Sequence, residues 1–282
     1  MPARSRPRSH TRPASAIRAH YEIERALAAR LLAAPAAERS RTYGEVYDEL
    51  FRRVPDHPQL QRAQDPAARA REIAAMAGVL ARLVPAGSVY MEVGAGDCAL
   101  TRLVAARVSR AIAIDVSELV VGANALPENV DFVISDGRRF DVVDGSVDFA
   151  FSNQLLEHLH PDDVGLHLAE VWRVLRPGGR YFIITPNALT GPHDISRGFD
   201  ATATGLHLKE FRNGELAAAC RDAGFRRVEI LVMRGTRILR IPLWLMQLIE
   251  GLISRLPRAP RAWLLGRRSM RNGLGIKLVA IR

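Results

Sequence analysis

A glycine turn preceded by an acid is the first feature of this sequence whose spacing suggests chemistry. The segment VYMEVGAGDCAL, residues 89–100, leads from an apolar stretch containing Glu92 directly into Gly94 and Gly96. Glycine lets the backbone turn tightly and approach a ligand, and a helix that starts behind the turn presents free N–H groups. The segment therefore predicts a strand, a ligand-binding turn and a helix.

Acids recur at the same place after the next two apolar runs, as Asp115 and Asp136. The letters GAGDCA also satisfy the dinucleotide pattern G-x-G-x-x-A, with Asp115 in the ribose-binding position. A nicotinamide-dependent oxidoreductase is therefore one interpretation. Glu92, however, would face the same crevice and repel a pyrophosphate, whereas it suits a ligand that carries positive charge.

The elements that must position these acids alternate between short apolar strands and helices from Ser88 onward. Such alternation is typical of a parallel sheet covered on both faces, which binds ligands beyond the carboxyl ends of its strands. We expect an α/β fold with a Rossmann-like, doubly wound sheet, mostly parallel with an antiparallel last strand. An N-terminal helical extension and a helical insertion before the last strand complete it. The expected strands are 89–93, 111–114, 130–134, 147–151, 180–185, 228–233 and 274–281, and the expected helices are 16–33, 41–53, 65–83, 98–106, 118–125, 162–175 and 214–223.

Composition and charge narrow the class of protein. The 282 residues are 48% hydrophobic and 25% charged, which is ordinary for a globular protein. The net charge of +10 is concentrated at the two ends, so we disfavour a whole-surface nucleic-acid binder and keep an anionic partner at the ends open. The two cysteines have no spacing partners and the N-terminus lacks the apolar core of a secretory signal, so we expect a cytoplasmic protein.

The series of motifs resembles the class I S-adenosylmethionine-dependent methyltransferases, and most of all their type 11 group. The resemblance covers about 88–233 and the final strand. Asp97 stands where many members have a third glycine. The matching segments are EVGAGD (92–97), AIDVS (113–117), SDGRRFDVVDGSVDFAFSN (135–153), EHL (157–159) and LRPGGRYFIITPN (175–187).

The resemblance implies that S-adenosylmethionine is the cofactor and that its methionine part lies at the glycine turn. Gly94, Ala95 and Gly96 would let the backbone approach this part of the ligand. Glu92 would lie near the amino group of the cofactor, directly or through water.

The same resemblance places the rest of the cofactor along the next strand ends. Asp115, followed by Val116, would accept both ribose hydroxyls, because a carboxylate has two acceptor oxygens. Asp136 would accept from the adenine amino group, and Gly137 would give the ring room. The residues expected to line the methyl-transfer side, at the end of the fourth strand, are Ser152 and Asn153.

A general base is needed only if the acceptor loses a proton, since a sulfonium methyl group is already a strong electrophile. The long loop after the fifth expected strand carries His193 and His207. These are our candidate catalytic residues, because loops at this edge face the substrate and histidine titrates near neutrality. The alternative, that an exposed loop histidine is merely solvated or bonded to backbone, stays open.

A metal is not expected. A quinone-pathway subgroup of the family has a Glu-x-x-Glu-His metal site, and here Gln154 stands in its first position ahead of Glu157 and His158. An amide is a weaker ligand than a carboxylate.

The segment 236–270 is the most individual part of the chain. Apolar residues recur there at helical spacing from Ile238 to Leu252, with Trp244 and Trp263 among them and arginines on both flanks. Such a segment can lie in a membrane interface, which would give contact through 238–265 with the inner face of the membrane. The favoured alternative is a helical pair that packs on its own sheet or forms a homodimer face.

We thus expect a methyltransferase (EC 2.1.1.-) that uses in-line transfer to a small-molecule or lipophilic acceptor, with O-methylation slightly favoured. The alternatives are an NAD(P)-dependent oxidoreductase, a non-catalytic cofactor-binding subunit and an RNA methyltransferase. Nucleic acid is disfavoured because SNQL (152–155) replaces the N/D-P-P-Y/F element of base-modifying enzymes. The expected parts are a disordered basic tail at 1–15, a helical cap at 16–87, an S-adenosylmethionine-binding domain at 88–235 and 271–282, and an amphipathic helical insertion at 236–270.

Overall fold

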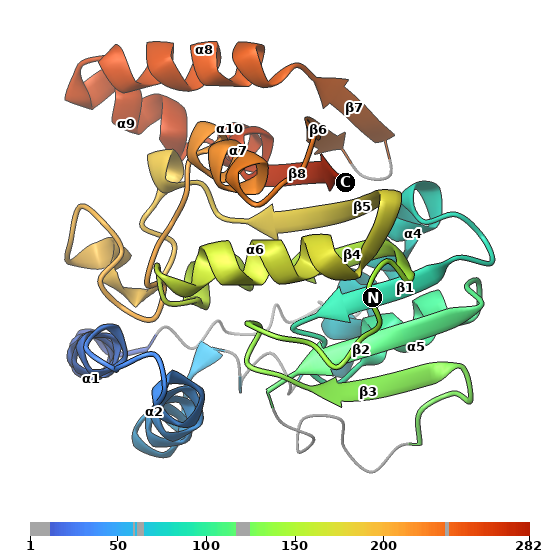
Figure 1. Cartoon of the computed structure of the whole chain (residues 1–282). Helices are drawn as coiled ribbons and strands as arrows, with labels where there is room; N and C mark the ends of the chain where they lie inside the picture. The colour runs from blue at the N-terminus through green and yellow to red at the C-terminus, as the bar shows by residue number, and fades with distance from the viewer. Residues whose placement is uncertain (1–11, 59, 61–64, 117–124, 235–236) are drawn as a thin grey trace, which may run out of the picture.

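The computed structural model describes residues 12–58, 60, 65–116, 125–234 and 237–282 (Figure 1). Most of the expected tail, and the expected helix 118–125 up to its last residue, lie outside these ranges. Residues 14 and 15, which we assigned to the tail, already belong to the first helix.

An eight-stranded sheet with the strand order β3-β2-β1-β4-β5-β8-β6-β7 forms the centre of the fold. The first five strands are mutually parallel, whereas β8 is antiparallel to both of its neighbours and β7 is antiparallel to β6. The expected mostly parallel sheet with an antiparallel last strand is confirmed. The strands are β1 Val89–Val93, β2 Arg110–Asp115, β3 Val130–Ile134, β4 Val147–Asn153, β5 Leu175–Thr185, β6 Arg227–Arg234, β7 Arg237–Ile241 and β8 Ile276–Ile281.

Helices cover both faces of this sheet, which explains why its central strands are apolar throughout. Along β1, Tyr90 packs with α4 (Pro66–Leu83) and α5 (Ala99–Ala105), whereas Met91 packs on the opposite face with α6 (Asp163–Val174) and α7 (Asn213–Asp222). Helix α4 lies within the expected cap at 16–87, but it belongs to this covering layer. The order of strands reverses between β1 and β4, so their carboxyl ends flank the crevice at which such sheets bind ligands.

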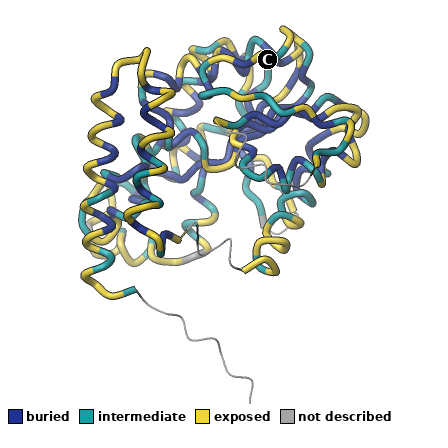
Figure 2. The backbone as a smooth tube through the Cα atoms, turned by 90° about the horizontal axis from the view of Figure 1, so that it is seen from below, coloured by how far each residue is buried: buried dark blue, intermediate teal, exposed yellow. Residues whose placement is uncertain are grey.

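Two N-terminal helices, α1 (Ala14–Leu32) and α2 (Arg39–Arg53), form a cap beyond the carboxyl ends of the parallel strands (Figure 1). Their facing sides share a small core of their own, which includes Leu31 and Leu50 and is joined by Leu206 from the connection between β5 and α7. Figure 2 shows the resulting contrast between buried inner and exposed outer faces. The cap is therefore in contact with the loop that carries both candidate catalytic histidines.

A buried arginine fastens the cap to the sheet domain. Arg39, at the start of α2, donates to Asp163 (2.7 Å), Asp162 (2.9 Å) and the carbonyl of Ala34 (3.0 Å). Asp163 is buried at the start of α6, and its second oxygen has no hydrogen-bond partner among the described residues. Among the described residues, Arg39 is therefore the cation that pairs directly with Asp163.

The insertion at 236–270 differs at its start from the expected helix. Ile238 and Ile241 lie in β7, paired with β6, and the helical stripe begins only after Pro242. Extending the helical spacing back to Ile238 was wrong, because the open edge of β6 satisfies the backbone of these residues and Pro242 fixes the first turn of the helix. The helices that follow are α8 Leu243–Arg255, α9 Arg258–Gly266 and α10 Arg268–Leu274. Among the described helices we find none that could span a bilayer.

Replacing Arg39 tests how the cap is held. We expect Arg39→Ala to lower the free energy of unfolding by about 3–5 kcal/mol, because it leaves a buried carboxylate without its cation. The measurement is urea unfolding followed by circular dichroism. Arg41→Ala is the matched control on the same helix: its side chain is 71% exposed and, within the described part of the chain, its salt bridges are those to Glu38 and Glu45 at 3.5 Å. Equal midpoints for the two variants would contradict the role of Arg39.

Candidate cofactor and acceptor site

The glycine turn after β1 adopts a backbone that favours glycine. Gly94 and Gly96 have φ angles of 76° and 55°, and Cys98, just before α5, follows with 57°. A side chain at Gly94 would meet Leu155 at 3.3 Å, whereas nothing lies within 4 Å of the position of a side chain at Gly96. The turn is thus packed against the protein at Gly94 and open at Gly96.

The carboxylate of Asp115, at the end of β2, is turned onto this glycine turn. One oxygen accepts from the N–H of Gly96 at 2.7 Å, and the other accepts from the N–H of Val116 at 2.8 Å. Val116 exposes its side chain and Ala95 is buried within the turn. The structure therefore brings together the motifs that the sequence placed on neighbouring strands.

Glu92 lies just below the turn in an enclosed position. Its carboxylate accepts from the hydroxyls of Thr101 at 2.6 Å and Tyr90 at 3.4 Å. Burial raises the pKa of Glu92 to about 7, and the negative charges of Asp97 and Asp115 act in the same direction. A cation placed nearby would favour the ionised form of Glu92.

Asp136, at the expected adenine position, is engaged by a residue of its own loop. Arg138 donates to one carboxylate oxygen from its side chain, at 2.8 and 2.6 Å, and to the other from its backbone, at 3.0 Å. Arg138 also donates to the carbonyl of Ala36 in the cap connection at 2.6 Å. An adenine amino group would have to share Asp136 with this arginine.

Ser152, expected on the methyl-transfer side, is buried, and its expected role stays a prediction. Its side chain is fully buried towards α6, in a chain of hydrogen bonds that runs through Tyr181 (2.7 Å) and His167 (2.9 Å) to the carbonyl of Gly137 (2.8 Å). A carbonyl can only accept, so His167 carries its proton on Nδ1, accepts from Tyr181 on Nε2, and leaves Ser152 as the donor to Tyr181. Burial lowers the pKa of His167 to about 4, which keeps it neutral. Alternation along β4 explains this burial, since Asn153 is the residue exposed at the strand end.

Glu210 joins the two candidate catalytic histidines. It accepts from Nδ1 of His207 at 2.9 Å and from the backbone N–H of His193 at 2.7 Å. Burial lowers the pKa of His193. Burial also acts to lower the pKa of His207, but the carboxylates of Glu210 and Glu157 outweigh it and the pKa is raised. The sequence showed Glu210 in the same loop, but its pairing with the two histidines was not predicted.

Nε2 of His193 is already bonded to Thr190 at 2.8 Å. His207, in contrast, donates from Nδ1 to a carboxylate, so its neutral form has the lone pair on Nε2. Of the two histidines, His207 is better arranged to take a proton.

A second buried acid lies beside His207. One oxygen of Glu157 accepts from Thr185 at 2.8 Å, and the other has no hydrogen-bond partner among the described residues. Burial raises the pKa of Glu157 to about 7. His158 donates from Nδ1 to the carbonyl of Leu206 at 2.9 Å, so its Nε2 also has a lone pair.

Ligand atoms of Glu157, His158 and His207 lie within 4.8 Å of one another. Imidazoles oriented by a bond from the far nitrogen can hold a divalent ion. The third member of this group is His207, from a distant loop. Gln154, which stands in the first position of the family's metal motif, is exposed and does not belong to the group. The expectation that no metal binds remains untested.

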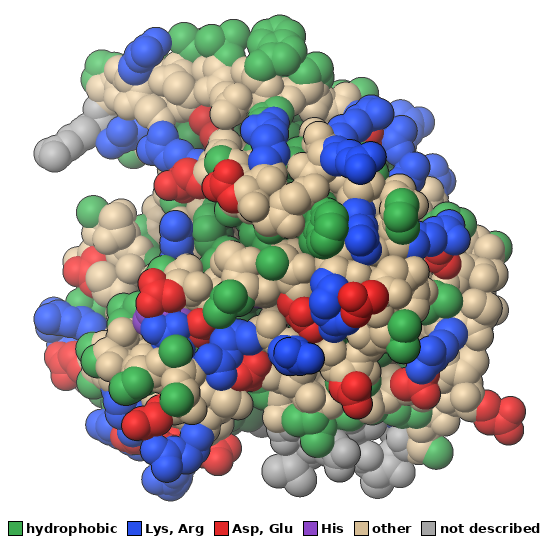
Figure 3. All heavy atoms as spheres, viewed as in Figure 1, with side chains coloured by type: hydrophobic (Ala, Val, Ile, Leu, Met, Phe, Trp, Pro, Cys, Tyr) green, Lys and Arg blue, Asp and Glu red, His purple; other side chains and the backbone are tan. Residues whose placement is uncertain are grey.

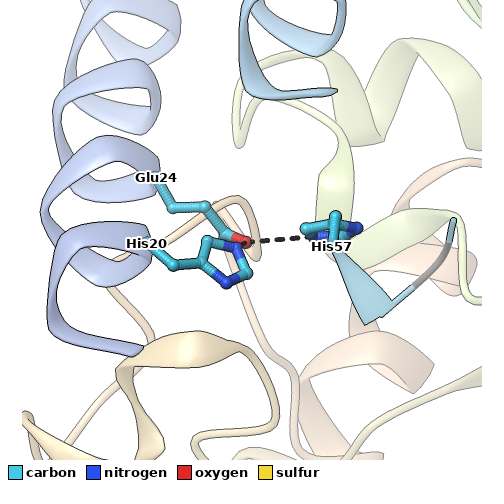
Figure 4. Close-up of side chains that lie close together, drawn as sticks. All are labelled: His20, Glu24 and His57. Atoms are coloured by element: carbon cyan, nitrogen blue, oxygen red, sulfur yellow. Dashed lines mark hydrogen bonds and ion pairs between the residues drawn. The ribbon is translucent and has the colours of Figure 1, made fainter. Parts of the chain in front are cut away.

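A further group of titratable side chains lies in the cap (Figure 4). His20 and Glu24 on α1 are 2.6 Å apart, and His57, after α2, lies 3.5 Å from the same oxygen of Glu24. Burial alone would raise the pKa of Glu24, but the bonds to His20 and His57 hold it at about 2. Arg12 donates to Nδ1 of His20 at 2.8 Å, so the proton of His20 sits on Nε2 and points to Glu24. This favours a hydrogen-bonded network over a metal site.

The second oxygen of Glu24 accepts from the N–H of Leu206 at 3.2 Å. Leu206 of the loop therefore has its N–H held by the cap and its carbonyl held by His158. Because His207 is the next residue, this grip fixes the loop at the candidate base.

The comparisons with known proteins agree with this geometry. Residues 91–183, from the glycine strand through most of β5, match the family model described as a methyltransferase domain. A ubiquinone biosynthesis O-methyltransferase of Xanthomonas axonopodis pv. citri is 30% identical over 167 residues, which cover 54% of this chain and 68% of that protein. The chain belongs to the class I S-adenosylmethionine-dependent methyltransferases. The family and the cofactor expected from the sequence are therefore confirmed.

Two further relatives of this methyltransferase are informative. A Mycolicibacterium smegmatis protein described as a probable S-adenosylmethionine-dependent methyltransferase is 33% identical over 141 residues, which cover 50% of this chain. The aligned part spans only about half, 52%, of that relative's length. The solved 1,6-didemethyltoxoflavin-N1-methyltransferase of Burkholderia thailandensis has a TM-score of 0.52 at 24% identity and covers 88% of this chain and 92% of its own, which shows a shared fold.

The role of Asp115 in the methyltransferase can be tested by binding. We expect Asp115→Ala to weaken the binding of S-adenosylhomocysteine at least tenfold, because hydrogen bonds to charged groups contribute roughly 1.5–3 kcal/mol. Titration calorimetry measures this. Asp131→Ala on β3 is the control, since Asp131 is half exposed and pairs with Arg110 away from the turn. Equal affinities for the two variants would remove Asp115 from the ribose site.

Glu92 makes a pH-dependent prediction. Its pKa in the fold is about 7 and the ordinary value is 4.5, so the folded state binds the extra proton and ionisation of Glu92 costs stability as pH rises through this window. A bound amino group would favour the ionised form, so we expect S-adenosylmethionine to bind more tightly as pH rises through about 7, with release of a proton. Calorimetry in buffers of different ionisation enthalpy counts that proton. Glu92→Gln should bind without the linked release, and an unchanged proton count would refute the assignment.

Proposed function

We propose that this chain transfers the methyl group of S-adenosylmethionine to a small or lipophilic acceptor, at the edge of the sheet covered by the cap. The observation that carries this proposal is the carboxylate of Asp115 turned onto the open glycine turn at Gly96, 2.7 Å from its N–H. A carboxylate in this position suits the two hydroxyls of a ribose. Glu92 below the turn suits a cationic ligand and not a pyrophosphate.

The remaining contacts of the cofactor would come from the same strand ends. Gly94, Ala95 and Gly96 would lie along its methionine part, and Val116 and Gly137 beside the nucleoside. Asn153, exposed at the end of β4, would face the methyl group. Asp136 would accept from the adenine amino group with the lone pairs that Arg138 does not occupy.

The acceptor would lie between this cofactor and the cap, near His207. In the proposed step, Nε2 of His207 takes the proton of an acceptor hydroxyl while the new O–C bond forms and the C–S bond of the cofactor breaks. Glu210 holds the ring through Nδ1 and stabilises the positive charge that develops on it. This arrangement favours O-methylation, because a base is required only when the acceptor loses a proton.

Similar proteins support methyl transfer to small molecules without fixing the atom. The Xanthomonas relative is named an O-methyltransferase, and a Triticum aestivum relative, 31% identical over 105 residues, is named a phosphoethanolamine N-methyltransferase. None of the named relatives favours a nicotinamide-dependent oxidoreductase or an RNA methyltransferase. The acceptor class proposed here therefore rests on the site.

Transfer of a labelled methyl group tests the proposal. Cell extract is incubated with the protein and methyl-labelled S-adenosylmethionine, and labelled products are sought by mass spectrometry. We expect a labelled product that is missing when Asp115→Ala replaces the wild type. Binding of S-adenosylhomocysteine without any labelled product would instead indicate a non-catalytic subunit.

His207→Gln separates the base from the rest of the site. We expect kcat to fall by about 10²–10⁴ because general-base catalysis is lost, with unchanged affinity for S-adenosylhomocysteine. His193→Gln is the matched control on the same loop. Its kcat should fall far less, since Nε2 of His193 is already bonded to Thr190. A full rate in His207→Gln would show that the acceptor needs no deprotonation by this residue.

A further inference from the structure

Helix α8 presents apolar side chains on two opposite faces. Met246 and Ile253 are buried against the sheet, as a surface helix requires. On the other face Trp244, Leu248 and Leu252 recur every fourth residue and remain 65%, 50% and 55% exposed. A helix that needed only to pack on its own sheet would carry polar residues on this second face.

The exposed apolar surface continues beyond α8. Leu239 on β7, Leu256 after α8 and Trp263 on α9 are exposed as well. In Figure 3 hydrophobic side chains follow the upper rim of the molecule, where Figure 1 places α8. Contiguous exposed apolar surface of this kind marks a docking site more often than it marks ordinary surface.

The segment that carries this stripe has exposed charges of one sign. From 237 to 275 the sequence contains one acid, Glu250, and its side chain is buried. Exposed arginines accompany the stripe, with Arg255 at the end of α8 and Arg267 stacked on Trp263 at 3.8 Å. The segment is therefore basic around an apolar centre.

We propose that α8 and α9 dock on the surface of an anionic lipid bilayer. Leucine and tryptophan side chains would enter the interface and arginines would meet lipid phosphates, which together suit an anionic membrane surface. A two-fold contact between copies would instead bring two arginine-rich rims together with no exposed acid of this segment between them. Nucleic acid offers phosphates but no apolar phase for Leu248 and Leu252.

Buried polar contacts connect this surface to the edge of the sheet. Glu250 of α8 accepts from the side chains of Asn187, after β5, at 2.6 Å and Asn213, at the start of α7, at 2.7 Å. Asn187 begins the loop that leads to His193. A docked α8 would therefore be held rigidly relative to the carboxyl edge of β5.

Vesicle sedimentation tests the proposal and needs neither cofactor nor acceptor. We expect the full-length protein to sediment with phosphatidylcholine vesicles that contain about one third phosphatidylglycerol, and to do so less at high salt, because the anionic leaflet attracts arginine. The double variant Leu248→Ser/Leu252→Ser should bind at least tenfold more weakly. Leu103→Ser/Leu166→Ser is the matched control, since these leucines are 48% and 54% exposed on other helices, and it should bind as the wild type does.

Three results would overturn the proposal. Wild-type protein that stays in the supernatant at low salt would remove the membrane as the occupant. Equal loss in both double variants would show that the stripe on α8 has no special role. A dimer in sedimentation velocity without vesicles, lost only in Leu248→Ser/Leu252→Ser, would assign the face to a second copy of the chain.

Discussion

An ionised carboxylate inside a protein must find hydrogen-bond donors or a cation, because its desolvation is costly. This chain places such groups where its parts meet. Asp163 receives Arg39 and joins the cap to α6, and Glu24 receives the N–H of Leu206 and joins the cap to the acceptor loop. Glu250 receives Asn187 and joins α8 to the end of β5. The relative positions of cap, sheet and insertion thus depend on a few buried acids, each of which needs its donors in one arrangement.

Glu92 and Glu157 belong to a different class of buried acid. Burial raises the pKa of each to about 7, and nearby hydroxyls compensate it only in part. Glu92 lies beneath the glycine turn and Glu157 lies beside His207. The carboxylates whose burial is only partly compensated are therefore at the proposed site, whereas the fully paired carboxylates hold the fold together. This division is expected where a ligand supplies the missing interaction.

The sequence was sufficient where a property depends on near neighbours. The glycine turn at Gly94 and Gly96 and the acid at the end of β2 have local signatures. The mostly parallel sheet and the approach of Asp115 to the turn therefore followed from the motif and its family. The burial of Ser152 could also have been read locally, because alternation along β4 puts it on the face of Ala150 and not on that of Asn153.

Other features could not be read locally. The pairing of Ile241 with Ile230 overrides a plausible helical spacing, and only the fold reveals that the edge of β6 is open. Glu24 and Leu206 are 182 positions apart, so nothing near either residue announces their contact. The competition of Arg138 for Asp136 involves residues only two apart, but an arginine there has many directions available and only packing against the cap selects this one.

The two backbone hydrogen bonds of Leu206 couple the position of the cap to the position of His207. The N–H belongs to Glu24 on the cap and the carbonyl to His158 on the sheet domain, so α1 cannot lift away without disturbing the segment that leads into His207. Closure of the cap over an acceptor and the placement of His207 would then occur together. An opened cap would therefore leave an acceptor beside a His207 whose position is no longer fixed.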